Sequence, residues 1–64
     1  MMTAAKYVRH IAKLIGADVI SAGREVLVYD WSTGKGLCIV EASGWDEARA
    51  KLSAYMVARQ DARA

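Results

Sequence analysis

The sequence contains one cysteine, Cys38, and one histidine, His10. A single cysteine cannot form an intrachain disulfide, and one cysteine with one histidine cannot supply the four ligands of a structural zinc site. A chain of 64 residues also buries only roughly 60% of the surface that it exposes when unfolded. We therefore expect one domain, residues 1–64, that depends on close packing, on a partner or on self-association for additional stability.

Long apolar runs are also absent. Residues 1–15 are interrupted by Lys6, Arg9, His10 and Lys13, so the continuous apolar region of a secretory signal is not expected. No stretch of the sequence approaches the roughly 20 apolar residues that a membrane span needs. A lone cysteine without an export signal is typical of a reducing compartment. We therefore expect a cytoplasmic protein that makes no membrane contact.

Acidic residues are missing from the first 17 positions, although the formal net charge of the whole chain is only +2. In this segment Lys6, Arg9, His10 and Lys13 recur at i, i+3, i+4 and i+7, which is the spacing of one helix face. We call these four residues the basic stripe. Two interpretations stay open: a contact surface for phosphates or an acidic protein surface, and a solvated helix face without a partner.

The N-terminal segment has the periodicity of an amphipathic helix. Thr3 is a suitable N-cap, because its hydroxyl can accept from a free N–H group of the first turn. Gly16 can adopt the positive φ that commonly follows a helix. These signals predict a helix over residues 4–15. Its apolar face is formed by Ala4, Val8, Ile11 and Ile15.

A second helix is predicted in the C-terminal part. Ser43 is expected to cap it, with Asp46 and Glu47 placing negative charge at the positive end of the helix dipole. The helix should begin at residue 44 or 45 and end near residue 60. Glu47 and Lys51 form an i, i+4 pair in the favourable orientation. The apolar face comprises Trp45, Ala48, Leu52, Tyr55 and Met56.

Three runs of strand-forming residues lie between the helices, at positions 18–22, 25–31 and 37–42. Residues 32–36, with two glycines, are a turn that joins the last two runs into a β-hairpin. The expected fold is α+β, in the order α-β-β-β-α, with an antiparallel hairpin and two helices packed on the sheet. If the first run forms no strand, the order is α-β-β-α.

The predicted strands are apolar on both faces, whereas a sheet covered on one side alternates apolar and polar residues. Val26 and Val28 point one way, while Leu27, Tyr29 and Trp31 point the other. Several explanations stay open. One helix can cover each face, the uncovered face can form a homodimer or dock a different partner, or a small core can wrap around these residues.

Few residues suggest chemistry. Tyr29 and Trp31 are either platforms on which bases stack or aromatic residues of a protein interface or core. Cys38 lies in the middle of a strand and is expected to be a small buried hydrophobe, which argues against a nucleophilic pair with His10. Residues 32–36 lack the spacing and the following helix of a phosphate-binding loop. We expect no catalytic residue, no cofactor and no metal site.

The segment from Glu25 to Gln60 resembles the second half of a double-stranded-RNA-binding domain. The resemblance rests on Val26-Leu27-Val28-Tyr29, on the Gly34-Lys35-Gly36 turn and on a helix that begins Asp46-Glu47-Ala48. It implies α-β-β-β-α order with both helices on one face of the sheet. That family opens its last helix with lysines that grip phosphates, whereas this chain has Gly44-Trp45-Asp46-Glu47 there.

In size, ordinary composition and lack of catalytic residues the chain also resembles small phage-encoded accessory proteins of the anti-CRISPR type. This resemblance implies a non-enzymatic inhibitor or adaptor that binds a larger protein or ribonucleoprotein complex. Two alternatives stay open, a nucleic-acid-binding domain and a homodimeric structural protein. The expected partner-binding residues are Lys6, Arg9, His10, Lys13, Tyr29 and Trp31.

Overall fold

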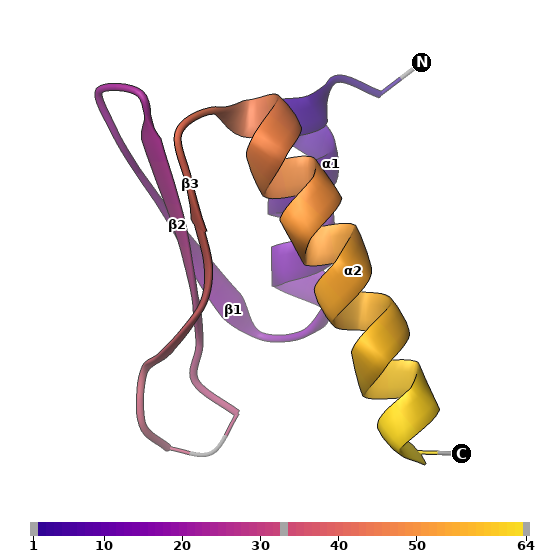
Figure 1. The fold of residues 1–64 in the computed structure, drawn as a ribbon. Helices are drawn as coiled ribbons and strands as arrows, with labels where there is room; N and C mark the ends of the chain where they lie inside the picture. Colours follow the sequence, from indigo (N-terminus) through magenta and orange to yellow (C-terminus); the bar gives the residue numbers. More distant parts are fainter. Residues whose placement is uncertain (1, 33, 64) are drawn as a thin grey trace.

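Two helices and three strands form the predicted α-β-β-β-α order (Figure 1). The computed structural model describes residues 2–32 and 34–63, with side chains described up to Gln60. The first strand, the least regular of the predicted runs, is present. The elements are α1 (Ala4–Leu14), β1 (Ala17–Ala22), β2 (Glu25–Asp30), β3 (Leu37–Ala42) and α2 (Trp45–Arg63).

The predicted capping residues of α1 are confirmed, and the helix ends at Leu14, one residue before its predicted end. The hydroxyl of Thr3 accepts a hydrogen bond of 3.2 Å from the backbone N–H of Lys6. Ile15 takes the C-cap position, and Gly16 follows with a φ of +72°. Glycine reaches this left-handed conformation without a steric penalty, so the chain reverses here and enters β1 directly.

The strands form one antiparallel sheet in the order β1-β2-β3. The register between β2 and β3 shifts at Val28 and Tyr29, so that Val28 pairs with Val40 but Tyr29 pairs with Cys38. Ile39 is the extra residue of this irregularity. The predicted second strand was one residue too long, because β2 ends at Asp30 and Trp31 lies beyond it. Thr33, in the predicted turn of residues 32–36, lies outside the described residues.

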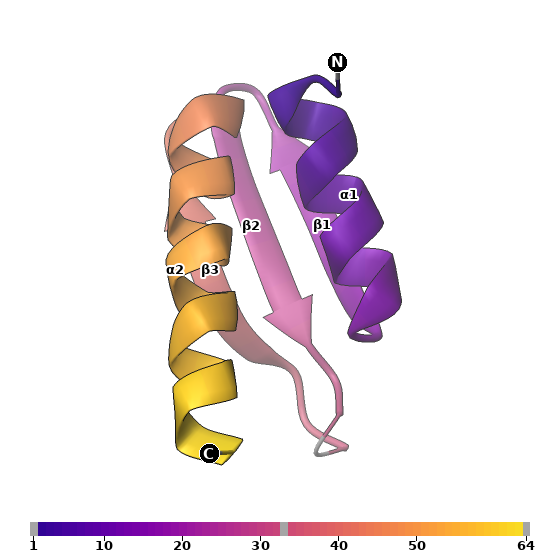
Figure 2. The ribbon, with the colours of Figure 1, turned by 90° about the vertical axis from the view of Figure 1, so that its right-hand side faces the viewer.

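Both helices cover the same face of the sheet (Figure 2). Helix α1 packs against β1, α2 packs mainly against β3, and the helices contact each other. This excludes the explanation in which one helix covers each face. Ala12 is also buried, although the predicted apolar face of α1 omitted it. The core consists of Val8, Ala12, Ala17, Val26, Val28, Val40, Ala42, Ala48 and Leu52.

The start of α2 agrees with the prediction of residue 44 or 45. The helix begins at Trp45, and the carbonyl of Gly44 accepts from the N–H of Ala48. The Glu47 side chain reaches back toward the segment before the helix, and its carboxylate accepts from the Ser43 N–H at 2.9 Å. Glu47 also pairs with Lys51 at 3.5 Å, as predicted. The helix continues to Arg63, past the predicted end near residue 60, because Ala and Arg favour helix there.

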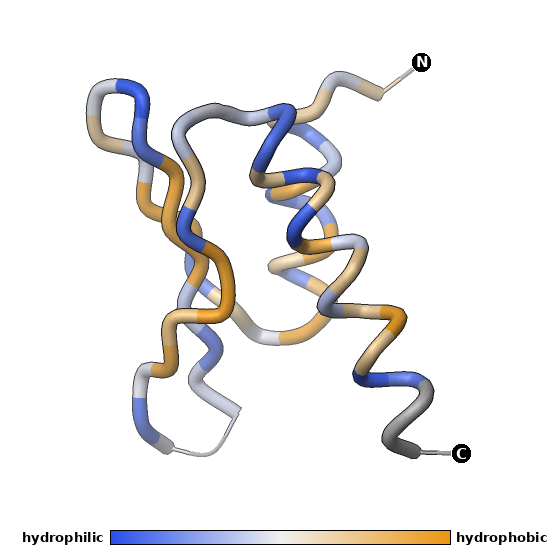
Figure 3. Tube along the Cα trace, in the orientation of Figure 1, coloured by the Kyte–Doolittle hydropathy of each residue, from blue (hydrophilic) through white to orange (hydrophobic). Residues whose placement is uncertain are grey.

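The tube in Figure 3 is hydrophobic along much of the strands and alternates between hydrophobic and hydrophilic segments along the helices. None of the helices in the described part of the chain combines the length and the apolar character needed to cross a membrane.

Candidate functional site

The sheet surface turned away from the helices carries no other element of the described chain (Figure 1). Cross-strand partners point to the same side of a sheet, so the register identifies the residues on this surface. Leu27 faces outward between its partners Ile20 and Glu41, and Tyr29 lies between Asp18 and Cys38. We call this surface the open face. Its residues are Asp18, Ile20, Ala22, Glu25, Leu27, Tyr29, Cys38 and Glu41.

The centre of the open face is apolar. Ile20 is 47% exposed, while Leu27 and Tyr29 are half-buried between their strand neighbours. Cys38 is exposed, which corrects the prediction of a buried thiol, and its Sγ donates to the carbonyl of Val40 at 3.3 Å. His10 is on α1, beyond the covered face of the sheet, so the structure does not bring Cys38 and His10 together.

The rim of the open face is acidic. Asp18, Glu25 and Glu41 are exposed there, and the three strands contain no lysine or arginine. The fourth strand acid, Asp30, points to the covered side. The basic stripe, in contrast, lies on α1, on the opposite side of the sheet. The chain is therefore nearly neutral in sum but has an acidic and a basic side.

The basic stripe is not uniform. Lys6, His10 and Lys13 are exposed. Arg9 is exposed as well, but its guanidinium carbon lies 5.0 Å from the centroid of the Trp45 ring, within the range of a cation–π contact. Arg9 therefore contributes to joining α1 to the first residue of α2, which the sequence spacing did not indicate.

A second contact of this kind also joins the helices. The guanidinium carbon of Arg49 lies 5.1 Å from the ring centroid of Tyr7. The Tyr7 hydroxyl and the Ser53 hydroxyl are 3.1 Å apart and share a hydrogen bond. Both aromatic rings are thereby placed between the helices.

Trp31 is 50% exposed and lies against the turn. A Cβ atom added at Gly36 would come within 2.8 Å of the Trp31 ring, so the ring rests directly on the glycine backbone. The carbonyl of Trp31 also accepts from the Gly34 N–H at 2.9 Å. Trp31 thus stabilises the turn, in addition to its predicted role as a contact residue.

Asp30 is buried under α2, with 7% of its surface exposed. One carboxylate oxygen accepts from the Ser32 N–H at 2.9 Å, and the other accepts from the Tyr55 hydroxyl at 3.2 Å. These hydrogen bonds, with that of the Ser32 backbone the largest cause, lower the pKa of Asp30. Burial and the bond to Asp30 raise the pKa of Tyr55 above its usual value. The pair fixes the end of β2 to α2.

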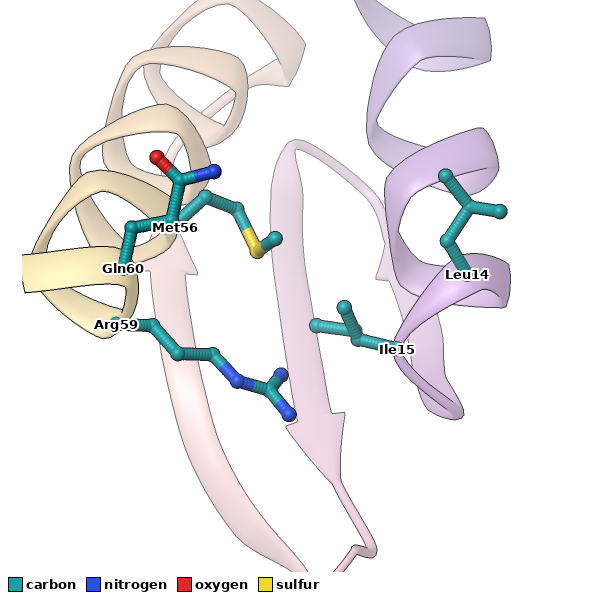
Figure 4. A pocket seen from close by; sticks show the side chains of 5 residues that line it. All are labelled: Leu14, Ile15, Met56, Arg59 and Gln60. Carbon is teal, nitrogen blue, oxygen red and sulfur yellow. The ribbon is translucent and has the colours of Figure 1, made fainter. Parts of the chain in front are cut away.

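A pocket of about 350 Å³ opens between the C-terminal parts of the two helices (Figure 4). Leu14 and the C-cap residue Ile15 line it at the end of α1, and Met56, Arg59 and Gln60 line it from α2. Sequence reasoning missed this site, because its residues share no motif. The only indication of the pocket in the sequence is Arg59, which lies one helical turn beyond Tyr55 on the side of α2 that faces the sheet.

Within residues 2–32 and 34–60, no three side chains of His, Cys, Asp or Glu gather closely enough to hold a metal ion. Comparison of the chain with protein-family models, with curated proteins and with solved structures finds no match.

Proposed function

We propose that the chain is a non-enzymatic interaction module, an inhibitor or adaptor that binds a larger protein or ribonucleoprotein assembly through the open face. The observation that carries this proposal is the uncovered apolar centre of that face, with Ile20, Leu27 and Tyr29 side by side. Contiguous exposed apolar residues surrounded by polar ones are typical of protein-interaction sites.

The acidic rim defines the class of partner. Asp18, Glu25 and Glu41 surround the apolar centre, and no basic strand residue offsets them. A surface that presents apolar side chains flanked by lysine or arginine is complementary to this pattern. Nucleic acid is a poor fit for the open face, because phosphates meet three carboxylates there. The proposed partner surface is therefore a basic, partly apolar protein surface.

The same charges disfavour a symmetric homodimer through the open face. A two-fold contact places the same patch of both copies together, and thus brings the acids of one copy close to those of the other. Like charges across an interface oppose association. A head-to-tail contact, in which the open face meets the basic stripe of another copy, carries no such penalty. Sedimentation of the purified chain over a range of concentrations distinguishes these states.

The test is affinity capture from cell lysate with the tagged full chain, with and without nuclease, using matched variants. The captured protein is then purified, and its Kd is measured for each variant. We expect Leu27→Asp to weaken binding at least about tenfold, by removing the apolar centre. Glu41→Lys should weaken it more than the neutral control Glu41→Gln, and this difference should shrink as salt increases.

The stripe variant is the double substitution Lys6→Glu and Lys13→Glu. If the Kd changes in the stripe variant but not in Leu27→Asp, the proposal is contradicted. The stripe variant leaves out Arg9, because Arg9 contacts Trp45 and its replacement also affects helix packing. The stripe variant therefore tests charge with little effect on the fold.

Nucleic-acid binding through the basic stripe is the second candidate. The observation that favours it is a helix without acidic residues whose Lys6, His10 and Lys13 are all exposed. If the chain binds nucleic acid, the material that it captures from lysate should disappear after nuclease treatment. Its affinity for labelled RNA or DNA should also fall steeply as salt increases, because counterions are released on binding. The start of α2 offers no phosphate contact in this candidate, because Glu47 occupies it.

A further inference from the structure

The pocket between α1 and α2 has the size of a small-ligand site and two kinds of wall. Its volume of about 350 Å³ is at the lower end of the range for small-molecule sites, roughly 300–1,000 Å³. Leu14, Ile15 and Met56 supply apolar walls, while Arg59 and Gln60 supply polar groups. Figure 4 shows the Arg59 side chain extending from α2 toward Ile15, with its guanidinium in the gap between the helices.

Arg59 has a donor that the described chain does not satisfy. Its Nη1 atom is buried and has no hydrogen-bond partner among the described residues. No ion pair of Arg59 is present in residues 2–32 and 34–60 either. Buried polar atoms are nearly always hydrogen-bonded, and an unsatisfied donor on a charged group is particularly unfavourable. The guanidinium also lines the pocket, so an acceptor that carries negative charge there would pair with its positive charge.

The surroundings of Arg59 restrict that acceptor. The Asp30 carboxylate is close enough for the Arg59 charge to contribute to lowering the pKa of Asp30. It is already occupied by Ser32 and Tyr55. A dianion such as phosphate would be repelled by Asp30 and would place charge against the apolar walls. A ligand with one carboxylate and an apolar body can pair with Arg59 and also pack against the apolar side chains of the pocket.

We infer that this pocket binds a small apolar monocarboxylate, whose carboxylate accepts from the guanidinium of Arg59 and whose apolar body lies against Ile15 and Met56. The site is distinct from the open face, because it lies between the helices on the opposite side of the sheet. Occupation of the pocket would bridge the C-terminal parts of α1 and α2.

Octanoate is the probe, titrated into the ¹⁵N-labelled full chain and followed by two-dimensional NMR. We expect saturable shifts of the backbone amides of Ile15, Met56 and Arg59, with no matching shifts on the open face. Octanol tests the carboxylate, and inorganic phosphate tests the apolar body; each should bind at least about tenfold more weakly than octanoate. Equal binding of octanol, or of phosphate, would overturn the inference.

Two sets of variants assign the contact. Arg59→Met keeps an unbranched apolar side chain and removes the donor, so octanoate should bind about 10- to 100-fold more weakly, the range for a hydrogen bond to a charged group. Arg24→Met is the control, because Arg24 is exposed in the turn between β1 and β2. Unchanged affinity in Arg59→Met, or an equal loss in Arg24→Met, would refute the role of Arg59.

Leu14 provides a variant that does not depend on replacing Arg59. Leu14 is 68% exposed, so substitutions there leave the core unchanged. Leu14→Glu places a negative charge at the pocket and should weaken octanoate binding, whereas the matched Leu14→Gln should retain most of it. Equal affinities for these two variants would count against a charged ligand. Loss of open-face binding would leave this result untouched, so the two proposals fail separately.

Discussion

The two faces of the sheet come from the same three strands but have different kinds of side chain. The covered face has small, fully buried residues, among them Val26, Val28 and Val40. The open face has larger ones, Leu27 and Tyr29, which are only half-buried. The helices cover the smaller side chains, and the larger apolar side chains of β2 lie on the face that no helix covers.

The acidic side chains on the two faces also differ in whether they are hydrogen-bonded within the protein or exposed to solvent. On the covered face, the only strand acid within the described residues is Asp30, and hydrogen bonds satisfy both of its oxygens. On the open face, Asp18, Glu25 and Glu41 remain in solvent. A folded core requires that each buried polar group be satisfied, whereas a recognition surface can keep its charges for a partner. The difference between the faces thus separates residues that stabilise the fold from those available for binding.

The same substitution on neighbouring residues of β2 tests this separation most severely. Val28→Asp buries an unpaired charge, which costs several kcal/mol. A domain of this size has only about 3–5 kcal/mol of core stability. We therefore expect Val28→Asp to be unfolded in water, as measured by far-ultraviolet circular dichroism.

Leu27→Asp is the matched variant on the open face. Its side chain reaches solvent, so we expect a loss of about 1–2 kcal/mol in the free energy of unfolding, measured with urea, and an otherwise native spectrum. Similar destabilisation by both variants would mean that the open face is part of the core. That result would also remove the main support for the proposed interaction surface.

The buried Asp30 and the exposed acids of the open face should also differ in their contribution to unfolding at low pH, and this effect is expected to be smaller. The pKa of Asp30 in the folded chain is below its usual value of 3.8. Its carboxylate therefore contributes stability above about that pH, and the contribution is lost as the pH falls through the lowered pKa. Asp30→Asn should flatten the decline of stability in this range, measured as urea midpoints at a series of pH values.

The contribution of Glu47 to the pH dependence of stability must be removed in that experiment. Its pKa is also lowered, first by the Ser43 N–H and then by the charge of Lys51, so it contributes in the same direction. The comparison is therefore Glu47→Gln against Glu47→Gln with Asp30→Asn. Tyr55→Phe in the same background should give an intermediate slope, because it removes one of the two donors to Asp30. An unchanged slope in the double variant would show that Asp30 does not link β2 to α2 as described.

The sequence was sufficient for the order of the elements and for most of their bounds. Thr3 and Gly16 ended α1 as predicted, because capping depends on local chemistry. The bounds of β3 were predicted to the residue, because its flanking segments favour turns. The exposure of Cys38 was not predictable, because it follows from the register shift at Val28 and Tyr29.

The candidate sites were less predictable than the fold. Both faces of the strands are apolar in sequence, so only the positions of the helices decide which one is open. The pocket depends on where the C-terminal parts of the helices lie, and Arg59 carries no local signal of its unsatisfied Nη1. The basic stripe was visible as a pattern, but the contact of Arg9 with Trp45 links residues far apart in the chain.

That contact leads to the prediction with the smallest expected effect. If Arg9 stabilises the packing of α1 on α2 while Lys6 only carries charge, then Arg9→Gln should lower the free energy of unfolding by about 0.5–1 kcal/mol, the value of an exposed cation–π contact. Lys6→Gln is the matched control and should not lower it. Trp45→Leu should make the two variants equal in stability. Equal effects of Arg9→Gln and Lys6→Gln with Trp45 present would show that the stripe acts as a uniform charged surface.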